Sequence, residues 1–324
     1  MFFKYKLTIT EIFFMIPSIE ILEINTQSVP VIKINNVQLF DVNKVFDCGQ
    51  CFRFDKVESS LHEVEYAGVA HGKYISFAQD GDMLTIYNSS AEEYEGIWKH
   101  YLGLDRDYGA INSSLLSLSS NPALADAIDR SSGIRILKQD PWEAICSFII
   151  SQNNNIPRIK KLVSALSLRC GEKVSVDGME DHIAEAHKGS EGNFYSFPSP
   201  EKVASLGIDG LAELKTGFRA KYIYDAAEKM LSGEIDLKLL NTSDTRTCIE
   251  HLCRVKGIGI KVASCALLFG FEKLDAFPVD VWIKKVIAKY FSEDFDHRLL
   301  GEYAGIAQQY LFYYERYLQS KGED

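Results

Sequence analysis

Positions 252–269 have the sequence LCRVKGIGIKVASCALLF, in which Gly257 and Gly259 separate two segments with helical periodicity. Glycines at this spacing permit a tight hairpin with exposed backbone amides. Amides at the start of the second segment, helped by the dipole of a helix there, can hold a DNA phosphate without reading its sequence. The turn alone fits a plain helix end and connector better, so its interpretation depends on the residues around it.

A lysine and an aspartate, two residue types that are suited to catalysis, follow this hairpin. Lys261 falls one or two positions into the second helix, and Asp280 comes 19 residues later, directly after Pro278 and Val279. Because an apolar helical face over 283–290 begins next, we expect Asp280 to cap that helix. A capping aspartate and a surface lysine would explain both residues structurally. A side chain that caps a helix can nevertheless also take part in catalysis.

The composition is that of a folded protein without a membrane segment. The 324 residues are 46% hydrophobic and 12% aromatic, which is enough for two domains or one large core. Four charged residues interrupt the apolar stretch 1–22, which also lacks a small-residue cleavage site, so it predicts neither a signal peptide nor a membrane span. We assign no function to residues 1–14. We expect a cytoplasmic or nuclear monomer.

The charge is acidic overall but uneven. A formal net charge of −10 argues against a protein that coats DNA tightly and without specificity. Residues 153–173 nevertheless carry five Lys or Arg against one acid, and residues 251–289 carry seven against three. Local basic faces can therefore meet phosphates while the rest of the surface stays acidic.

The seven cysteines are scattered, which is typical of a protein from a reducing compartment. Cys48 and Cys51 have the spacing of a zinc or redox pair, but the chain has no second such pair. We therefore predict no metal and no cofactor.

The pattern predicts an α+β protein. An antiparallel hairpin is expected from residues 74–77 and 83–87 around Asp80-Gly81, and Asp140-Pro141 should cap and begin a helix. Residues 172–192, polar and aperiodic, are interpreted as a surface insertion. We expect an N-terminal arm (1–29), an antiparallel β-rich domain (30–130) and a helical domain (131–324) with the hairpin at about 246–270 and an aspartate loop at 275–281. Other helices are expected near 156–169, 200–206, 220–231, 245–253, 260–269, 281–290 and 301–319.

The hairpin, the following loop and Asp280 together resemble the helix-hairpin-helix and aspartate signature of the base-excision DNA glycosylase superfamily. Within it, the chain is similar to the 8-oxoguanine DNA glycosylase family from about residue 36 to 318. Four further runs carry this resemblance: FDCGQCFR at 46–53, SQNNNIPR at 151–158, GFRAKY at 217–222, and Ala307-Gln308 with Phe312.

The resemblance implies a glycosylase with strand-cleaving lyase activity on duplex DNA that contains oxidised guanine. Lys261 would attack the sugar and form a Schiff base, while Asp280 would stabilise the oxocarbenium-like sugar. The attacking amine must be neutral, which burial and the neighbouring charges of Lys256 or Arg254 are expected to favour. No metal is needed for either step.

Recognition residues are also implied by the resemblance. Asn153, Arg158 and Arg219 would hold the orphaned cytosine with Phe218 as a wedge, although the Asn153–Asn155 run by itself fits a self-capping polar loop. Each residue of the implied base pocket, given next, also has a purely structural interpretation, as part of the core or, for Gly49, as part of a turn. The implied pocket consists of Phe312 and Cys265 on the two faces of the flipped base, Gln308 at its Watson–Crick edge, Phe269 in the wall, and the Gly49 carbonyl at N7–H. The implied phosphate contacts are Gly257, Ile258, Gly259 and Lys261.

Two residues depart from the family pattern. Trp282 stands where many members place a histidine near the phosphates, and Phe269 is bulkier than the expected methionine. An alkylpurine glycosylase would share the fold and the aspartate but would attack with water and need no lysine. Many adenine- or pyrimidine-specific relatives carry a C-terminal four-cysteine iron–sulfur cluster, and this chain has no cysteine after Cys265. A non-catalytic helix-hairpin-helix module would bind duplexes without forming products.

Overall fold

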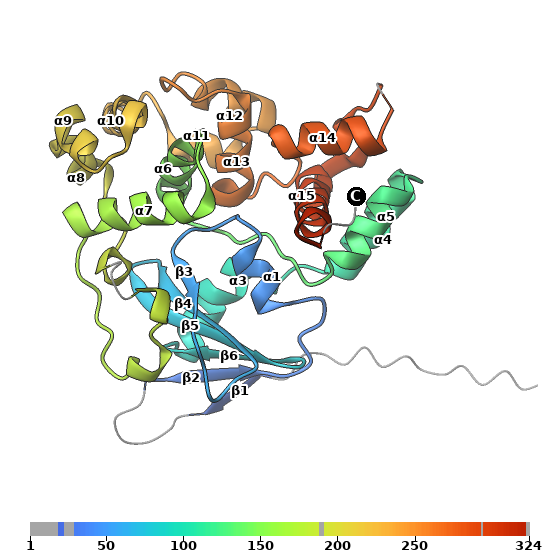
Figure 1. Ribbon diagram of the computed structural model, residues 1–324, viewed down its shortest axis with the longest axis horizontal. Helices are drawn as coiled ribbons and strands as arrows, with labels where there is room; N and C mark the ends of the chain where they lie inside the picture. The colour runs from blue at the N-terminus through green and yellow to red at the C-terminus, as the bar shows by residue number, and fades with distance from the viewer. Residues whose placement is uncertain (1–18, 23–28, 188–190, 293, 322–324) are drawn as a thin grey trace, which may run out of the picture.

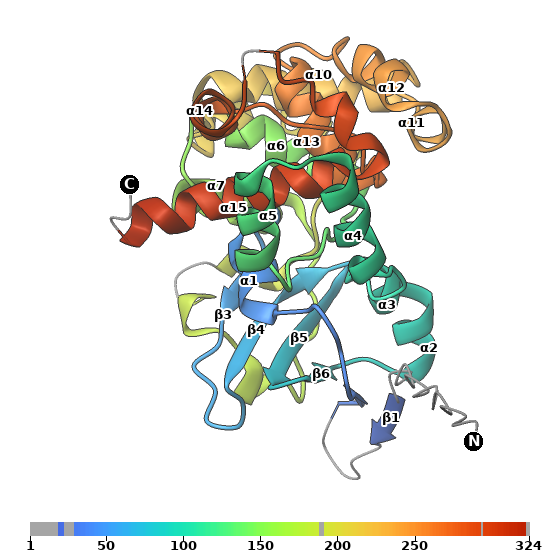
Figure 2. The ribbon, with the colours of Figure 1, turned by 90° about the vertical axis from the view of Figure 1, so that its right-hand side faces the viewer.

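The computed structural model describes residues 19–22, 29–187, 191–292 and 294–321. A β-sheet lies at one end of the molecule and a larger group of helices at the other (Figures 1 and 2). The predicted α+β class, with an N-terminal antiparallel sheet before a mostly helical region, is confirmed. Residues 1–14, to which we assigned no function, lie outside the described residues.

Six antiparallel strands form the sheet in the order β1-β2-β6-β5-β4-β3. The predicted hairpin is confirmed as β5–β6, and Gly81 takes the positive φ of 59° that its two-residue turn needs. The strand β1 falls within the predicted N-terminal arm and pairs with β2. The strands are β1 (Ile19–Leu22), β2 (Val31–Ile34), β3 (Phe54–Lys56), β4 (Val64–Ala70), β5 (Lys73–Asp80) and β6 (Met83–Tyr87).

Both faces of the sheet are covered. On one face, Phe77 and Ile75 pack against Phe46 of α1 (Val42–Asp47) and Trp98. On the other face, the alternating residue Tyr74 packs in a small core with parts of the 172–194 segment. Our prediction that residues 172–192 are a surface insertion is therefore wrong, because this segment covers a sheet face.

Two buried histidines hold that segment in place. His182 Nδ1 lies 2.7 Å from Glu65 Oε1 on β4, and His187 Nδ1 lies 2.9 Å from Asp55 Oδ2 on β3. The segment contains three short 3-10 turns, η2 (Glu180–His182), η3 (Glu185–His187) and η4 (Glu191–Phe194). Its polar composition reflects these anchoring contacts rather than exposure alone.

The predicted helices are largely confirmed, and Asp140 caps α6 with Pro141 in its first turn. The last helix begins at Ala304 rather than Gly301, because Gly301 has a φ of 68° that breaks the helix. The first helices are α2 (Ala91–Glu93), α3 (Lys99–Tyr101), α4 (Tyr108–Leu118), α5 (Pro122–Arg130), α6 (Pro141–Ser151) and α7 (Ile156–Cys170). The later ones are α8 (Pro200–Ser205), α9 (Gly207–Glu213), α10 (Ala220–Leu231), α11 (Leu237–Thr242), α12 (Thr245–Leu252), α13 (Ile260–Phe271), α14 (Val281–Tyr290) and α15 (Ala304–Lys321). Three further segments complete the set: η1 (Tyr94–Trp98), a π-helical turn, and the 3-10 segments η5 (Gly217–Arg219) and η6 (His297–Tyr303).

The helices share one hydrophobic core with α13 inside it. Every α13 residue from Val262 to Phe271 is buried, so only the first turn of this helix reaches the surface. Cys48 and Phe52, which flank a turn after α1, also belong to the helical core. This packing brings the turn at Gly49 from the sheet region to the helices. Helices α4 and α5 pack in the same core, and the division into domains stays a prediction.

Among the described residues, we find no helix with the length and apolar character to cross a membrane.

Candidate active site

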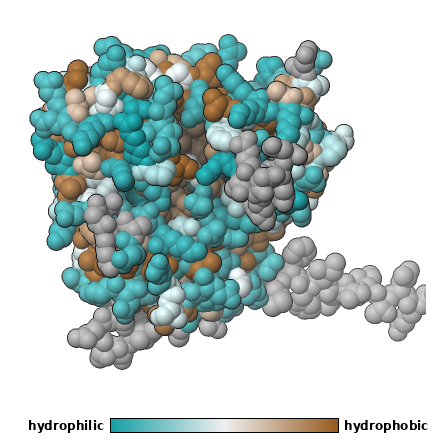
Figure 3. All heavy atoms as spheres, in the orientation of Figure 1, coloured by the Kyte–Doolittle hydropathy of each residue, from teal (hydrophilic) through white to brown (hydrophobic). Residues whose placement is uncertain are grey.

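One cavity of about 800 Å³ gathers most of the residues that the sequence singled out. It lies where the α6–α7 junction, α13, α14 and α15 meet the Gly49 turn, and Figure 3 shows this face of the molecule, on which apolar atoms emerge among hydrophilic ones. The predicted residues in its wall are Gly49, Asn153, Gly259, Lys261, Cys265, Phe269, Asp280, Gln308 and Phe312, together with Trp282. The other predicted residues, Gly257, Ile258, Arg158, Phe218 and Arg219, do not line it.

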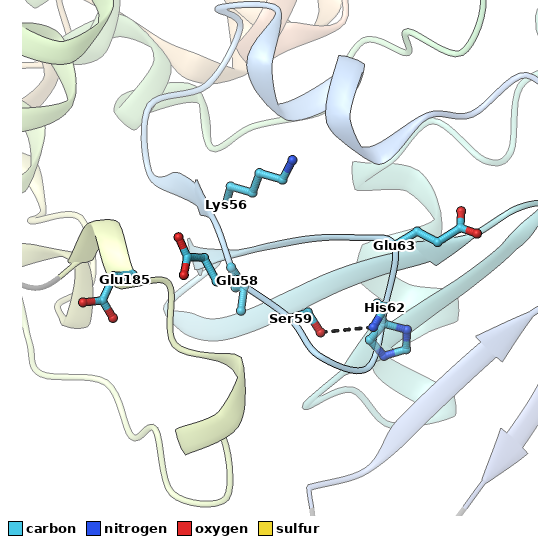
Figure 4. A pocket seen from close by; sticks show the side chains of 7 residues that line it. Lys56, Glu58, Ser59, His62, Glu63 and Glu185 are labelled. Carbon is cyan, nitrogen blue, oxygen red and sulfur yellow. Dashed lines mark hydrogen bonds between the residues drawn. The ribbon is translucent and has the colours of Figure 1, made fainter.

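A second hollow, of about 580 Å³, lies beside the loop between β3 and β4. Figure 4 shows its side chains pointing in different directions, with Lys56 away from Glu63 and Glu185 on a separate segment. The hydrogen bond drawn there joins the His62 amide to Ser59 Oγ at 3.2 Å and only shapes the loop. This hollow brings together no reacting groups.

The hairpin presents its amides as the sequence predicts. Gly257 has a φ of 79°, and a Cβ there would fall 2.3 Å from the Tyr222 ring, so only glycine fits. Gly259 is the N-cap of α13 and makes no side-chain capping bond. Ile258 between them is buried and anchors the turn. Gly257 and Gly259 are exposed, whereas the Ile258 amide donates to the Val255 carbonyl at 3.1 Å and is not free for an anion. The first amides of an α-helix have no partner within the helix, so the exposed start of α13 suits an anion.

Lys261 lies in the first turn of α13, one turn before Cys265. Burial raises the pKa of the Cys265 thiol to about 11, although the Lys261 ammonium lowers it in part. The two side chains therefore lie close together in the cavity wall. Lys256, whose charge we expected beside Lys261, pairs instead with Asp225: its ammonium lies 3.3 Å from Asp225 Oδ1, and it does not line the cavity. Arg254 does not line the cavity either.

Asp280 is the N-cap of α14, as predicted. Its Oδ1 accepts hydrogen bonds from the amides of Trp282 at 2.9 Å and Ile283 at 2.8 Å. Both capping bonds use one oxygen, which leaves Oδ2 for another partner. Because Asp280 also lines the cavity with Lys261, the structure combines the capping role and the exposure to the cavity that catalysis would need.

The opposite wall comes from α15. Gln308 is buried, and its Oε1 has no hydrogen-bond partner. A buried amide oxygen without a partner is costly and indicates a place where a ligand donates. Phe312, one turn later, lines the cavity, and Phe269 stacks on Phe148 at a centroid distance of 5.3 Å. Phe269 therefore forms a rigid aromatic wall.

Gly49 enters the cavity from the sheet region. Its φ is 83°, and a Cβ there would lie 3.3 Å from Ile156 Cδ1 and 3.8 Å from Phe312 Cε1. Both the backbone conformation and the space therefore favour glycine. Gln309 Nε2 donates to the Cys48 carbonyl at 3.0 Å, which ties this turn to α15.

The α6–α7 junction carries the asparagine run. Asn155 caps α7 by accepting from the Arg158 amide at 3.0 Å, so the self-capping interpretation holds for this residue. Asn153 is different, since it is exposed with a φ of 47°. Arg219 is buried behind this turn, where its Nε donates to the Gln152 carbonyl at 2.9 Å and its Nη2 to the Asn153 carbonyl at 3.0 Å.

Phe218 and Arg158 remain at the surface. Phe218 is 45% exposed, and its ring lies 4.4 Å from the Arg219 guanidinium carbon. An exposed aromatic residue supported by a buried arginine has the form of a rigid wedge. Arg158 is exposed on the first turn of α7.

Three cationic or aromatic residues line the cavity although the sequence predicted no definite role for them there. Trp282 lines the cavity with the Lys285 ammonium 4.7 Å from the centre of its ring, and Lys284 lines it from the same helix. Arg316 also lines it, one turn after Phe312. The spacing 308, 312 and 316 was a signal for the last of these, because side chains four apart share a helix face.

The cysteine pair is buried. Burial raises the pKa of the Cys48 thiol to about 12 and that of Cys51 still further. Within the described part of the chain, no cluster of three or more His, Cys, Asp or Glu side chains could hold a metal ion.

Comparisons with known proteins match this arrangement over most of the chain. Residues 31–145 match the family described as 8-oxoguanine DNA glycosylase, N-terminal domain, and residues 146–298 match the HhH-GPD superfamily base excision DNA repair protein. An N-glycosylase/DNA lyase OGG1 from Arabidopsis thaliana is 28% identical over 295 residues, which cover 82% of this chain and 75% of the relative.

Two solved structures are similar over nearly their whole length. A structure of MBOgg1 with a low-affinity DNA ligand is 36% identical, with a TM-score of 0.79 and coverage of 93% of this chain and 99% of that chain. The Clostridium acetobutylicum 8-oxoguanine glycosylase/lyase, bound to double-stranded DNA with cytosine opposite 8-oxoguanine, is 34% identical with a TM-score of 0.79. Those matches cover 94% of this chain and 98% of the clostridial chain.

Proposed function

The chain belongs to the 8-oxoguanine DNA glycosylase family, and we propose that it excises 8-oxoguanine paired with cytosine from duplex DNA and then cleaves the strand. One observation carries this proposal. Lys261 at the start of α13 and Asp280 at the start of α14 line a single cavity, opposite an unpartnered buried Gln308 oxygen. A nucleophile, a carboxylate and a polar reader thus face one space large enough for a purine.

Lys261 would act as the nucleophile. The lone pair on its Nζ forms a bond to C1′ of the flipped nucleotide, the C1′–N9 bond breaks, and the departing base takes up a proton. Nζ then loses one proton, the C1′–O4′ bond breaks as O4′ takes up a proton, and the C1′=Nζ double bond of a protonated Schiff base forms. Removal of a C2′ proton then expels the 3′ phosphate and cleaves the strand. Asp280 would stabilise the positive charge that develops on the sugar before the new bond forms.

The base would be recognised from three sides. Gln308 Oε1 would accept a hydrogen from the Watson–Crick edge, and Phe312 and Cys265 would contact the two ring faces. Guanine presents the same edge and the same faces, so these contacts do not distinguish it. The Gly49 carbonyl would accept the hydrogen that 8-oxoguanine, unlike guanine, carries on N7.

The opposite strand would be held at the α6–α7 junction. Flipping a base leaves its cytosine without a partner, and Asn153 and Arg158, both exposed there, would hydrogen-bond to it. Phe218 would fill the gap in the stack. Arg219 is engaged with the 152–153 carbonyls, and we propose that it acts on the cytosine while it supports this turn.

The hairpin would hold the backbone of the damaged strand. The amides of Gly257 and Gly259 and the Lys261 charge lie at the exposed start of α13, where a phosphate is favoured. The Ile258 amide donates to the Val255 carbonyl at 3.1 Å, so Ile258 would contribute by fixing the turn. We propose that the chain acts on DNA as a monomer, cytoplasmic and nucleoid-associated in a bacterium or nuclear in a eukaryote.

The alternative activities are not favoured. An alkylpurine glycosylase of this fold activates water with the aspartate and has no use for an amine at the position of Lys261. A binding module without activity has no use for a lysine and a carboxylate that line one cavity.

The test is a gel assay with a duplex that contains one 8-oxoguanine opposite cytosine. The wild type should release the base, cleave the strand and be trapped covalently on DNA by borohydride. Lys261→Gln should lose all three activities but keep most of its affinity for the duplex. Lys99→Gln, which removes an exposed lysine paired with Glu95, is the matched control and should behave as wild type. Full activity or undiminished trapping in Lys261→Gln would refute the assignment.

A further inference from the structure

The mechanism gives no role to two charged residues of the cavity wall, Lys284 and Arg316. Arg316 lines the cavity on α15, and its guanidinium carbon lies 5.5 Å from the centre of the Phe312 ring. Among the residues that the structure describes, it forms no ion pair with a carboxylate. A cation that is held over an aromatic ring and is not neutralised keeps its hydrogen-bond donors for another acceptor.

Helix geometry gives Arg316 a defined place relative to the base. Gln308, Phe312 and Arg316 are four residues apart, so they form a row along one face of α15 that spans about 12 Å. A purine with its Watson–Crick edge at Gln308 and its rings on Phe312 points its five-membered ring towards Arg316. That end of the base carries C8 and N7.

The Gly49 turn supports the same placement. A Cβ on Gly49 would lie 3.6 Å from Arg316 Nη1 and 3.8 Å from Phe312 Cε1, so the guanidinium lies alongside Gly49. The carbonyl proposed to accept from N7–H therefore has a donor beside it. In 8-oxoguanine the N7 hydrogen and the C8 oxygen are adjacent, whereas guanine has a bare N7 and a hydrogen on C8.

We infer that Arg316 is a specificity-determining residue whose guanidinium donates a hydrogen bond to the C8 oxygen of the flipped base. The inference rests on the proposed function. With Gly49 it would present an acceptor and a donor side by side, complementary to the donor and acceptor that oxidation creates. Guanine would satisfy neither of them.

The experiment compares Arg316→Gln with wild type in single-turnover reactions on two duplexes. One contains 8-oxoguanine opposite cytosine, and the other contains a preformed abasic site opposite cytosine. Because a hydrogen bond from a charged donor is lost, excision of 8-oxoguanine should slow by about tenfold to a hundredfold. Cleavage at the abasic site, which has no base to recognise, should keep its wild-type rate. Arg298→Gln is the matched control, because Arg298 is exposed, bonded to Asp296 and outside this cavity.

Three results would overturn the inference. An unchanged excision rate would remove Arg316 from recognition, and equal losses on both duplexes would indicate a general effect. Weaker binding to undamaged DNA, with a salt dependence reduced by about one charge, would instead assign Arg316 to a phosphate. If Arg316→Gln lowers the melting temperature, Arg316→Met replaces it, because methionine keeps an unbranched stem over Phe312 but has neither charge nor donors, and the same selective loss is expected. A wild type that releases no 8-oxoguanine would contradict the proposed function itself.

Discussion

Replacement of Asp280 by asparagine separates its capping role from the catalytic role that we propose, because the capping bonds use only one oxygen and do not need the charge. Oδ1 alone accepts from the amides of Trp282 and Ile283, and the amide oxygen of asparagine can accept the same two bonds. Asparagine and aspartate cap helices about equally well, whereas alanine costs about 0.5–2 kcal/mol. Asp280→Asn should therefore unfold close to the wild-type temperature, and Asp280→Ala should unfold a few degrees lower.

The rate should respond to both substitutions. A preorganised charge at the reacting sugar is worth about a hundredfold to a thousandfold, or roughly 3–4 kcal/mol. We expect single-turnover excision of 8-oxoguanine by Asp280→Asn to fall by that factor, with Asp280→Ala at least as slow. The two variants should thus differ in thermal stability but share a large loss of rate.

The measurement is a melting curve and a single-turnover time course for each variant on one 8-oxoguanine·cytosine duplex. If Asp280→Asn unfolds at a temperature as low as that of Asp280→Ala, the asparagine amide does not cap α14. If Asp280→Asn excises 8-oxoguanine at the wild-type rate, Asp280 is a capping residue only. Either result would refute the separation of roles that the geometry implies.

The other predictions concern Gly49, the opposite base and the sheet. Gly49→Ala introduces a side chain at a φ of 83° and beside the cavity. The rate of 8-oxoguanine excision should therefore fall about tenfold or more, while the rate of cleavage at a preformed abasic site falls less. Equal losses of both rates would indicate misfolding. Asn153→Ala or Arg158→Ala should narrow the preference for cytosine over adenine by about 1–3 kcal/mol, and an unchanged ratio of rates in both would remove them from this role. Burial raises the pKa of Glu65, but hydrogen bonds led by His182 lower it more, so the pKa lies below its usual range. Its stabilising contribution is then present above about pH 4 and lost as pH falls further, and the melting temperature of Glu65→Gln should lie below wild type near neutral pH and approach it in acid.

The helical hairpin could be predicted because its signals are local. Glycine positions, helix periodicity and the cap at Asp280 depend on neighbours in the chain, and the structure places each helix boundary close to its prediction. The β5–β6 hairpin is local in the same way, since Gly81 defines its turn. Which residues share the cavity depends on packing between distant segments. The set of residues that line the cavity was therefore predicted from the family resemblance and not from helical periodicity.

The differences between prediction and structure arise from contacts that are distant in sequence. The 172–194 segment has the composition of a loop, but His182 and His187 find carboxylates more than a hundred residues earlier. Lys256 lies near Lys261 in sequence, yet it turns to Asp225 on α10. The position of Lys256 in the sequence therefore did not predict which charged side chain it contacts in the fold.

The separation between Lys261 and Asp280 follows from the length of α13. The twelve residues of α13, of which those from Val262 to Phe271 are buried, carry the chain about 18 Å into the core. The segment 272–279 returns it, so that the start of α14 lines the same cavity as the start of α13. Two helix N-termini therefore face one cavity. Each stabilises negative charge: the first can hold a DNA phosphate, and the second holds the Asp280 carboxylate through two amides. A cap that fixes a carboxylate beside the proposed nucleophile would serve the fold and the chemistry at once, because the sugar needs a fixed negative charge when its bond to the base breaks.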